Sequence, residues 1–160
     1  MARLRSWLYP HLATLATRWY TRLGLERQFP GNLEEFLQRC HAAGQTRPIP
    51  LLIQYKQGDY NCLHQDIYGE HVFPLQIAIL LSEPGEDFTE GDFILTEQWR
   101  RMQSRVDAVP LRKGDDIVFA GNDRPVKGSR GDYRVKMHHG VGTLHSGLRH
   151  TLGIIFHDAT

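Results

Sequence analysis

After Pro48 the sequence alternates short apolar runs with turn-forming segments. The runs have the length of β-strands and read LLIQY, VFPLQIAILL, DFILTE, AVPLR, DIVFAG, YRVKM and HTLGIIF. The intervening segments KQGD, EPGED, RKGDD and KGSRGD each contain a glycine that can supply a turn or a bulge. No long amphipathic helix separates the runs, which argues against a parallel βαβ sheet and favours two packed sheets. We therefore predict a jelly-roll, cupin-like in its arrangement, over residues 46–160.

Residues 1–45 have the pattern of helices. Apolar residues recur at the three-and-four spacing of one helix face: Leu4, Leu8, Leu12, Leu15, Trp19 and Leu23. Pro10 is expected to begin the regular part of this helix, at a first-turn position. Asn32 followed by Glu35 predicts a capped second helix through about Ala43, ended by Gly44. At 160 residues the chain fits a single domain, mainly β with N-terminal helices, in which residues 1–45 support the core at 46–160.

Composition restricts the class of protein. The formal net charge is +1, which indicates neither a disordered chain nor a general polyanion binder. No apolar run approaches the roughly 20 residues of a membrane span, and no signal-peptide pattern follows Met1. We therefore expect a cytoplasmic protein without a membrane partner, as a monomer or a weak homodimer. The two cysteines, Cys40 and Cys62, have no zinc-site spacing and are expected to be buried thiols.

Candidate metal ligands lie in the segments YNCLHQDIYGE and HHGV. His64 and Asp66 are two residues apart, so in extended chain both side chains point to one side. One such pair arises often by chance, but a third ligand follows about 75 residues later. Strand alternation and the ten-residue distance to Arg149 favour His139 for this position. His138 and His145 remain alternatives. Two histidines with one carboxylate form the facial arrangement of non-haem Fe(II) oxygenases, unlike the closed tetrahedral sites of structural zinc.

The order of several motifs resembles a known superfamily. These are His64-x-Asp66, Gly91-Asp92-Phe93, Pro110-x-x-x-Gly114 leading to DIVF, and His139 with Arg149 ten residues on. Together they resemble the 2-oxoglutarate/Fe(II)-dependent dioxygenases, in the prolyl 4-hydroxylase-like branch, over roughly Leu51 to His157. Members share a double-stranded β-helix. The chain is most similar to a bacterial subfamily, mostly of unknown substrate, for which action on damaged nucleic acid has been suggested.

The resemblance implies roles for individual residues. His64, Asp66 and His139 would bind Fe(II), and Arg149 with Thr151 would hold the distal carboxylate of 2-oxoglutarate. A guanidinium suits that carboxylate because it donates two parallel hydrogen bonds. Tyr55 lies where relatives often place a tyrosine that hydrogen-bonds the cofactor. A core-edge tyrosine with a solvated hydroxyl explains it equally well.

The implied activity couples oxidative decarboxylation of 2-oxoglutarate to succinate, with O2 as co-substrate, to hydroxylation or oxidative demethylation of a substrate. Nucleic acid, protein and small molecules all stay open as that substrate. The alternative is a cupin-like metal-binding domain, or a truncated relative, without turnover. The two differ in one property, because an active oxygenase slowly converts 2-oxoglutarate to succinate even without its substrate.

The segment from Trp99 to Lys136 is basic. It holds ten Lys or Arg residues against five Asp. Such a rim could follow a phosphate backbone, with Trp99 or Tyr133 as a stacking surface, although solvated loop charges explain it as well. The substrate candidates are Tyr68, Trp99, Arg100, Arg101, Lys127 and Arg130. No recognised nucleic-acid-binding motif is present.

Overall fold

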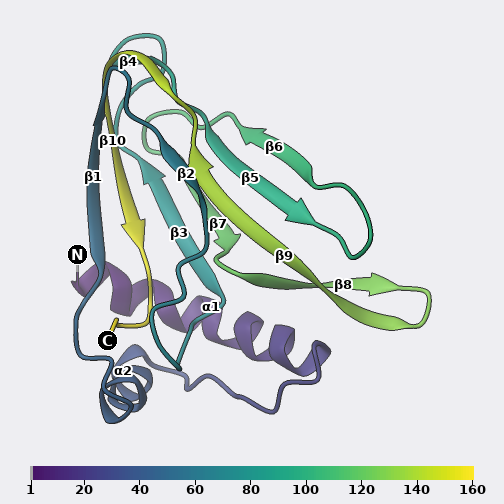
Figure 1. Cartoon of the computed structure of the whole chain (residues 1–160). Helices are drawn as coiled ribbons and strands as arrows, with labels where there is room; N and C mark the ends of the chain where they lie inside the picture. The colour runs from purple at the N-terminus through teal and green to yellow at the C-terminus, as the bar shows by residue number, and fades with distance from the viewer. Residues whose placement is uncertain (1) are drawn as a thin grey trace.

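The computed structural model describes residues 2–160 and is mainly β with helices at the N-terminus, as predicted (Figure 1). The helices are α1 (Ala2–Arg22) and α2 (Leu33–Ala42). The strands are β1 (Pro50–Lys56), β2 (Asn61–His64), β3 (Leu75–Leu80), β4 (Phe88–Glu90), β5 (Phe93–Gln98), β6 (Arg105–Val109), β7 (Asp116–Ala120), β8 (Asp123–Gly128), β9 (Gly131–Val141) and β10 (Leu144–Ile154). Among these residues no helix is long and apolar enough to cross a bilayer.

The strands form two antiparallel five-stranded sheets. One has the order β1-β10-β3-β7 with β4 also on β10, and we call it the helix-side sheet. The other has the order β2-β9-β5-β6 with β8 also on β9, and we call it the hairpin sheet. The chain passes repeatedly between them, since β1, β3, β7 and β10 belong to the first and β2, β5, β6 and β9 to the second. Strands distant in sequence thus become neighbours.

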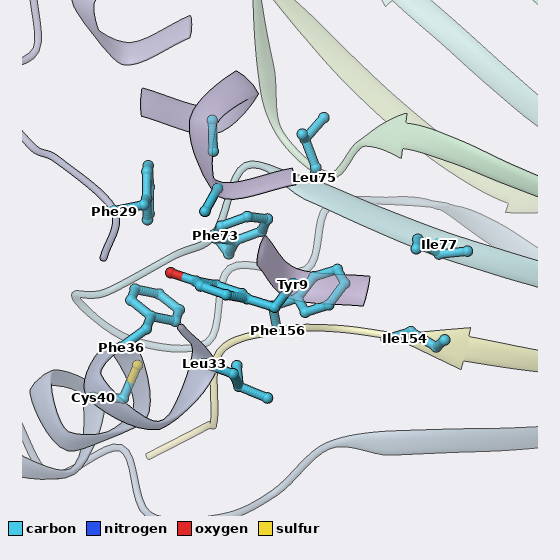
Figure 2. Packing of buried hydrophobic residues seen from close by; sticks show 12 residues of the cluster. Tyr9, Phe29, Leu33, Phe36, Cys40, Phe73, Leu75, Ile77, Ile154 and Phe156 are labelled. Atoms are coloured by element: carbon cyan, nitrogen blue, oxygen red, sulfur yellow. The ribbon is translucent and has the colours of Figure 1, made fainter. Parts of the chain in front are cut away.

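An aromatic core joins the helices to the helix-side sheet (Figure 2). Tyr9 of α1 and Phe36 of α2 pack with Phe29, Phe73 and Phe156, and neighbouring ring centroids lie 5.0–5.8 Å apart. Aromatic rings pack favourably at these separations and bury large apolar areas. A second cluster, which includes Phe93 and Phe119 of the two sheets, fills the space between the sheets.

The helix ends show where local sequence rules hold and where they fail. The Asn32 side chain accepts a hydrogen bond from the backbone N–H of Glu35, and α2 ends before Gly44 at φ 81°, as predicted. The position of Pro10 was predicted wrongly, because α1 begins at Ala2 and contains Pro10 in its interior. Pro10 and Ser6, whose carbonyl lacks the usual partner, are both exposed, so water can satisfy that carbonyl.

Several strand boundaries also differ from the prediction. The run AVPLR does not form a strand of its own. Its first two residues end β6 at Val109, because Pro110 has no N–H to donate to the sheet. YRVKM lies within the longer strand β9, and HTLGIIF begins within β10 but extends two residues past its end at Ile154. The strands β2, β4 and β8 were not expected. Cys40 is buried as predicted, whereas Cys62 is exposed. Its strand β2 is at the edge of the hairpin sheet, where one face meets solvent.

Candidate active site

Three potential ligands meet at one point between the sheets. His64 ends β2 and pairs in register with His139 of β9, while Asp66 follows β2 directly. The His64 Nε2 lies 3.5 Å from Asp66 Oδ1, and the His139 Nε2 lies 3.3 Å from Asp66 Oδ2. One ligand atom from each residue falls within 4.8 Å of the other two. Two imidazoles and a carboxylate on one side of a cavity form a donor set suited to a transition metal with open positions.

The surroundings orient both imidazoles. His64 Nδ1 donates to the Cys62 carbonyl at 2.7 Å, which leaves the Nε2 lone pair for a metal. The ring of His139 packs 4.7 Å from Phe119 and 4.2 Å from His64, and its buried Nδ1 has no hydrogen-bond partner. His138 and His145 do not join this cluster. Alternation along β9 turns His138 to the other face, and His145 is exposed on β10.

Asp66 is held in its ionised form. It is 3% exposed, and burial by itself raises its pKa. Hydrogen bonds from His139 and from the Tyr68 hydroxyl, together with the charges of both histidines, outweigh burial and bring the pKa to about 2. The Tyr68 hydroxyl donates to Asp66 Oδ1 at 2.8 Å, and this contact and burial raise the tyrosine's pKa to about 12. Tyr68, expected at the substrate, therefore supports a candidate ligand.

A buried glutamine fixes the loop that carries Tyr68. The Gln45 Nε2 donates to the carbonyls of Tyr68, His71 and Asp158 at 3.1, 3.2 and 2.7 Å, and its Oε1 accepts from the His71 N–H at 2.7 Å. Gly69 is required here, since its φ is +126° and a Cβ would lie 2.4 Å from the Gln45 side chain. The loop is thus tied to the end of α2 and to the C-terminal segment.

The cluster opens into a cavity between the two sheets. Its polar lining comes from His64, Asp66 and His139 and from Tyr55, Asn61, Gln76 and Thr151. The remaining walls are mostly apolar side chains of both sheets. The metal-ligand cluster and Thr151 therefore face the same enclosed space.

Arg149 lies behind Thr151 as a buried cation. It is 1% exposed, donates to the Thr151 hydroxyl, and lies over the rings of Tyr55 and Phe88 at 5.5 and 5.8 Å. Its Nε is buried without a partner, and no ion pair joins it to a carboxylate within residues 2–160. Burial lowers the pKa of its guanidinium. A buried cation without a counter-ion is costly, so this arrangement fits an anionic ligand.

The basic substrate candidates separate into two groups. Trp99, Arg100 and Arg101 line a groove together with Tyr133, Arg134 and Lys136, and the Trp99 and Tyr133 rings are 5.7 Å apart. We call this the basic groove. Lys127 and Arg130 do not line it, because they lie toward the turn between β8 and β9. The expected four-cation rim is therefore reduced to Arg100 and Arg101 within the groove.

Two further imidazoles outside the ligand cluster differ in their contacts. His150 contacts Gln54 at 2.7 Å and Ser82 at 3.3 Å. The His157 Nδ1 accepts a hydrogen bond from the Phe73 N–H. Its Nε2 is buried and has no hydrogen-bond partner within residues 2–160. Burial lowers the His157 pKa to about 4.

Sequence analysis did not single out Gln45, Gln76 or Asn61. Gln76 had a signal, because it is the only polar residue in the strand LQIAIL. Gln45 had none, because its partners are 23 to 113 residues away. The Asn61 Nδ2 lies 3.5 Å from the Tyr55 hydroxyl. Asn61 was missed because it belongs to β2, an edge strand that was not predicted.

Comparison of the sequence with known proteins identifies its relatives and its family. Two uncharacterized proteins of Mycobacterium tuberculosis, from strains CDC 1551 / Oshkosh and ATCC 25618 / H37Rv, are each 49% identical to the chain over 157 residues. The alignment covers 98% of this chain and 67% of each relative. A family described as an oxygenase catalysing oxidative methylation of damaged DNA matches residues 1–159. The match spans both helices, the two sheets and every candidate ligand, and the chain therefore belongs to this oxygenase family.

Proposed function

We propose that the protein is an Fe(II)- and 2-oxoglutarate-dependent dioxygenase. One observation carries the proposal: a single cavity has the His64–Asp66–His139 cluster on one wall and Thr151, which accepts a hydrogen bond from the buried Arg149, on another. A metal with open positions fits the first, and the free carboxylate of a metal-bound dicarboxylate fits the second. When bound, the pair supplies oxidative decarboxylation to succinate and CO2, coupled to oxygen insertion into a substrate C–H bond.

The chain's own residues bind and orient the 2-oxoglutarate. Arg149 neutralises the distal carboxylate, and the Thr151 hydroxyl, which accepts from Arg149, keeps its own proton to donate to that carboxylate. Tyr55 pairs with Arg149 and Ile53 pairs with Thr151 across β1 and β10, so the cofactor residues come from adjacent strands. The buried Tyr55 hydroxyl borders the cavity, in keeping with a cofactor contact rather than a solvated core edge.

We further propose that the two sheets form a double-stranded β-helix and that helices and sheets make one domain. The strand orders β1-β10-β3-β7 and β2-β9-β5-β6, with the chain passing repeatedly between sheets, support the first statement. The aromatic core shared by α1, α2 and the helix-side sheet supports the second.

The proposed substrate is damaged nucleic acid, hydroxylated or oxidatively demethylated. The family description and the basic groove support it. Lys136 of the groove and His139 lie three residues apart on β9, roughly 10 Å in a strand, but on opposite faces. We infer that the groove holds the flanking strand while the target base leaves its stack and enters the cavity.

The test is anaerobic titration of the protein with Fe(II) and 2-oxoglutarate, followed by the visible charge-transfer band of the chelated pair. His139→Ala should abolish the band, whereas the matched control His138→Ala should keep it. Arg149→Ala should retain metal but weaken 2-oxoglutarate binding by about 2–4 kcal/mol, because a charge-assisted contact is lost. A band that survives both His64→Ala and Asp66→Ala would refute the assignment of the ligands.

Succinate formation separates turnover from metal binding alone. On admission of O2 the loaded protein should convert 2-oxoglutarate slowly, and faster with its substrate. A protein that gives the band and no succinate is a metal-binding domain without catalysis.

A further inference from the structure

Gln76 is a polar side chain of the cavity whose amide nitrogen has no hydrogen-bond partner within residues 2–160. Gln76 lies on β3, is 3% exposed, and lines the cavity with the candidate ligands. Its Nε2 is buried and makes no hydrogen bond. The other residues of β3 are all apolar. A buried amide donor normally finds an acceptor, because leaving it unpaired costs the full desolvation of the group.

The neighbouring strand makes room for this amide. A Cβ on Gly121, just after β7, would lie 2.5 Å from the Gln76 Nε2 and 3.0 Å from its Cδ. The backbone of Gly121 is outside the left-handed region, so its conformation does not require glycine. A side chain at Gly121 would therefore displace the Gln76 amide from its present position.

The amide lies away from the cofactor carboxylate. Thr151 pairs with Leu80, so Gln76 is four residues further along β3, roughly 13 Å in a strand. Gln76 pairs with Phe119, whose ring packs on His139, and the amide leans beyond Phe119 toward Gly121. The five-carbon chain of 2-oxoglutarate spans only about 5 Å between its end carbons. A cofactor held between Thr151 and the metal thus ends short of the amide.

We propose that Gln76 is a specificity-determining substrate contact whose amide N–H donates to an acceptor on the target nucleobase. The proposal rests on the proposed function. Apart from the ligand cluster and a few neutral polar side chains, the cavity wall is apolar, with Leu51, Phe119 and Ile155 among its residues, and it carries no Lys or Arg. Such a wall suits a flat, neutral ring with a carbonyl oxygen or ring nitrogen, and it disfavours a phosphate. Unstacked bases are recognised in this way, through edge hydrogen bonds and apolar ring contacts.

Removal of the amide should affect discrimination and leave folding intact. Gln76→Leu keeps the approximate size and removes the donor, and Gln76→Glu keeps the shape and places a carboxylate there. Because the Nε2 has no protein partner, Gln76→Leu should leave the Tm equal or higher. A structural glutamine would instead lower the Tm on this change. Gln103→Leu, in the exposed loop between β5 and β6, is the matched control.

The experiment uses the full chain with Fe(II) and 2-oxoglutarate. The probes are single-stranded DNA oligonucleotides that each carry one methylated adenine, cytosine, guanine or thymine, and succinate release is measured. For the preferred base, Gln76→Leu should lower kcat/KM about 10- to 100-fold, the usual range for a lost base-edge contact. The charge-transfer titration with 2-oxoglutarate should stay within twofold of the parent. Gln103→Leu should match the parent in both assays.

Three results would overturn the proposal. If the probes stimulate succinate release equally in Gln76→Leu and in the parent, Gln76 has no role in substrate recognition. Weakened 2-oxoglutarate binding by Gln76→Leu assigns the amide to the cofactor. A parent that binds Fe(II) and 2-oxoglutarate but responds to none of the probes excludes a methylated DNA base as the ligand of Gln76. A parent without the charge-transfer band instead refutes the proposed function itself, so the two failures are distinguishable.

Discussion

The two sheets differ in what covers them. The helix-side sheet packs against α1 and α2 through the aromatic core, and its strand β3 is almost entirely buried. The hairpin sheet extends into the β5–β6 and β8–β9 hairpins (Figure 1), and three of the five residues of its strand β6 are exposed. The proposed cofactor residues Arg149 and Thr151 belong to the helix-side sheet, whereas His64, His139 and the basic groove belong to the hairpin sheet.

This difference assigns separate tasks to the sheets. A buried guanidinium needs a rigid, dry environment to hold a small anion selectively. The proposed nucleic-acid substrate would need an accessible approach to the proposed metal site, and the exposed hairpins would provide it. We expect most of the folding free energy to come from the helix-side sheet, and changes in the hairpin sheet to affect binding more than stability.

The largest expected effect is therefore in the aromatic core. Phe73 is fully buried and contacts four other rings, so Phe73→Ala should lower the free energy of unfolding by about 3–5 kcal/mol. Val106→Ala on β6, where the side chain is 61% exposed, should change it by less than about 0.5 kcal/mol. Urea unfolding measures both. Similar losses in the two variants would remove the contrast between the sheets.

The same contrast limits what the sequence can predict. Local rules gave the Asn32–Glu35 cap and the alternation that places Arg149 and Thr151 on one face, since both depend on neighbouring residues. They did not predict β2, β4 or β8. Short, partly exposed strands have weak sequence patterns, because such strands are stabilised mainly by pairing with neighbouring strands. The contacts of Gln45 were out of reach because they are non-local.

The second prediction concerns acid stability of the covered region. His157 is fully buried there and its pKa is about 4, against an ordinary 6.5. Above pH 6.5 the imidazole is neutral in both states and has no effect. Below pH 6.5 the imidazole becomes protonated in the unfolded chain but stays neutral in the folded chain down to about pH 4. The free energy of unfolding therefore falls as the pH falls. The gap of about 2.5 pH units corresponds to roughly 3 kcal/mol.

His157→Asn provides the control, because its amide oxygen can still accept from the Phe73 N–H and it does not titrate. In metal-free buffer the stability of this variant should decline less than that of the parent between pH 6.5 and 4. Parallel curves would show that His157 is not the source of the acid sensitivity.

A third prediction tests the link between the two regions. Gln45 ties the Tyr68 loop to the helical part, and the Tyr68 hydroxyl supports Asp66. Tyr68→Phe should weaken metal binding about 10- to 100-fold, since it removes a hydrogen bond that orients a ligand. The measurement is calorimetric titration with Mn(II), with Tyr60→Phe at an exposed tyrosine as the matched control. Equal affinity of Tyr68→Phe and parent would leave Asp66 oriented by the histidines alone.

The smallest effect is expected in the hairpin sheet. Arg100 and Arg101 line the basic groove, whereas Lys127 and Arg130 lie outside it, and none of the four is in an ion pair within residues 2–160. The double variants Arg100→Ala/Arg101→Ala and Lys127→Ala/Arg130→Ala therefore remove the same charge at different places. If the groove contacts phosphates, the first should reduce the log–log salt slope of single-stranded DNA binding by about 1.4, at roughly 0.7 per phosphate. The second should leave the slope near that of the parent. Equal reductions would mean that DNA responds to net charge alone, and no binding at low salt would favour a protein or metabolite substrate.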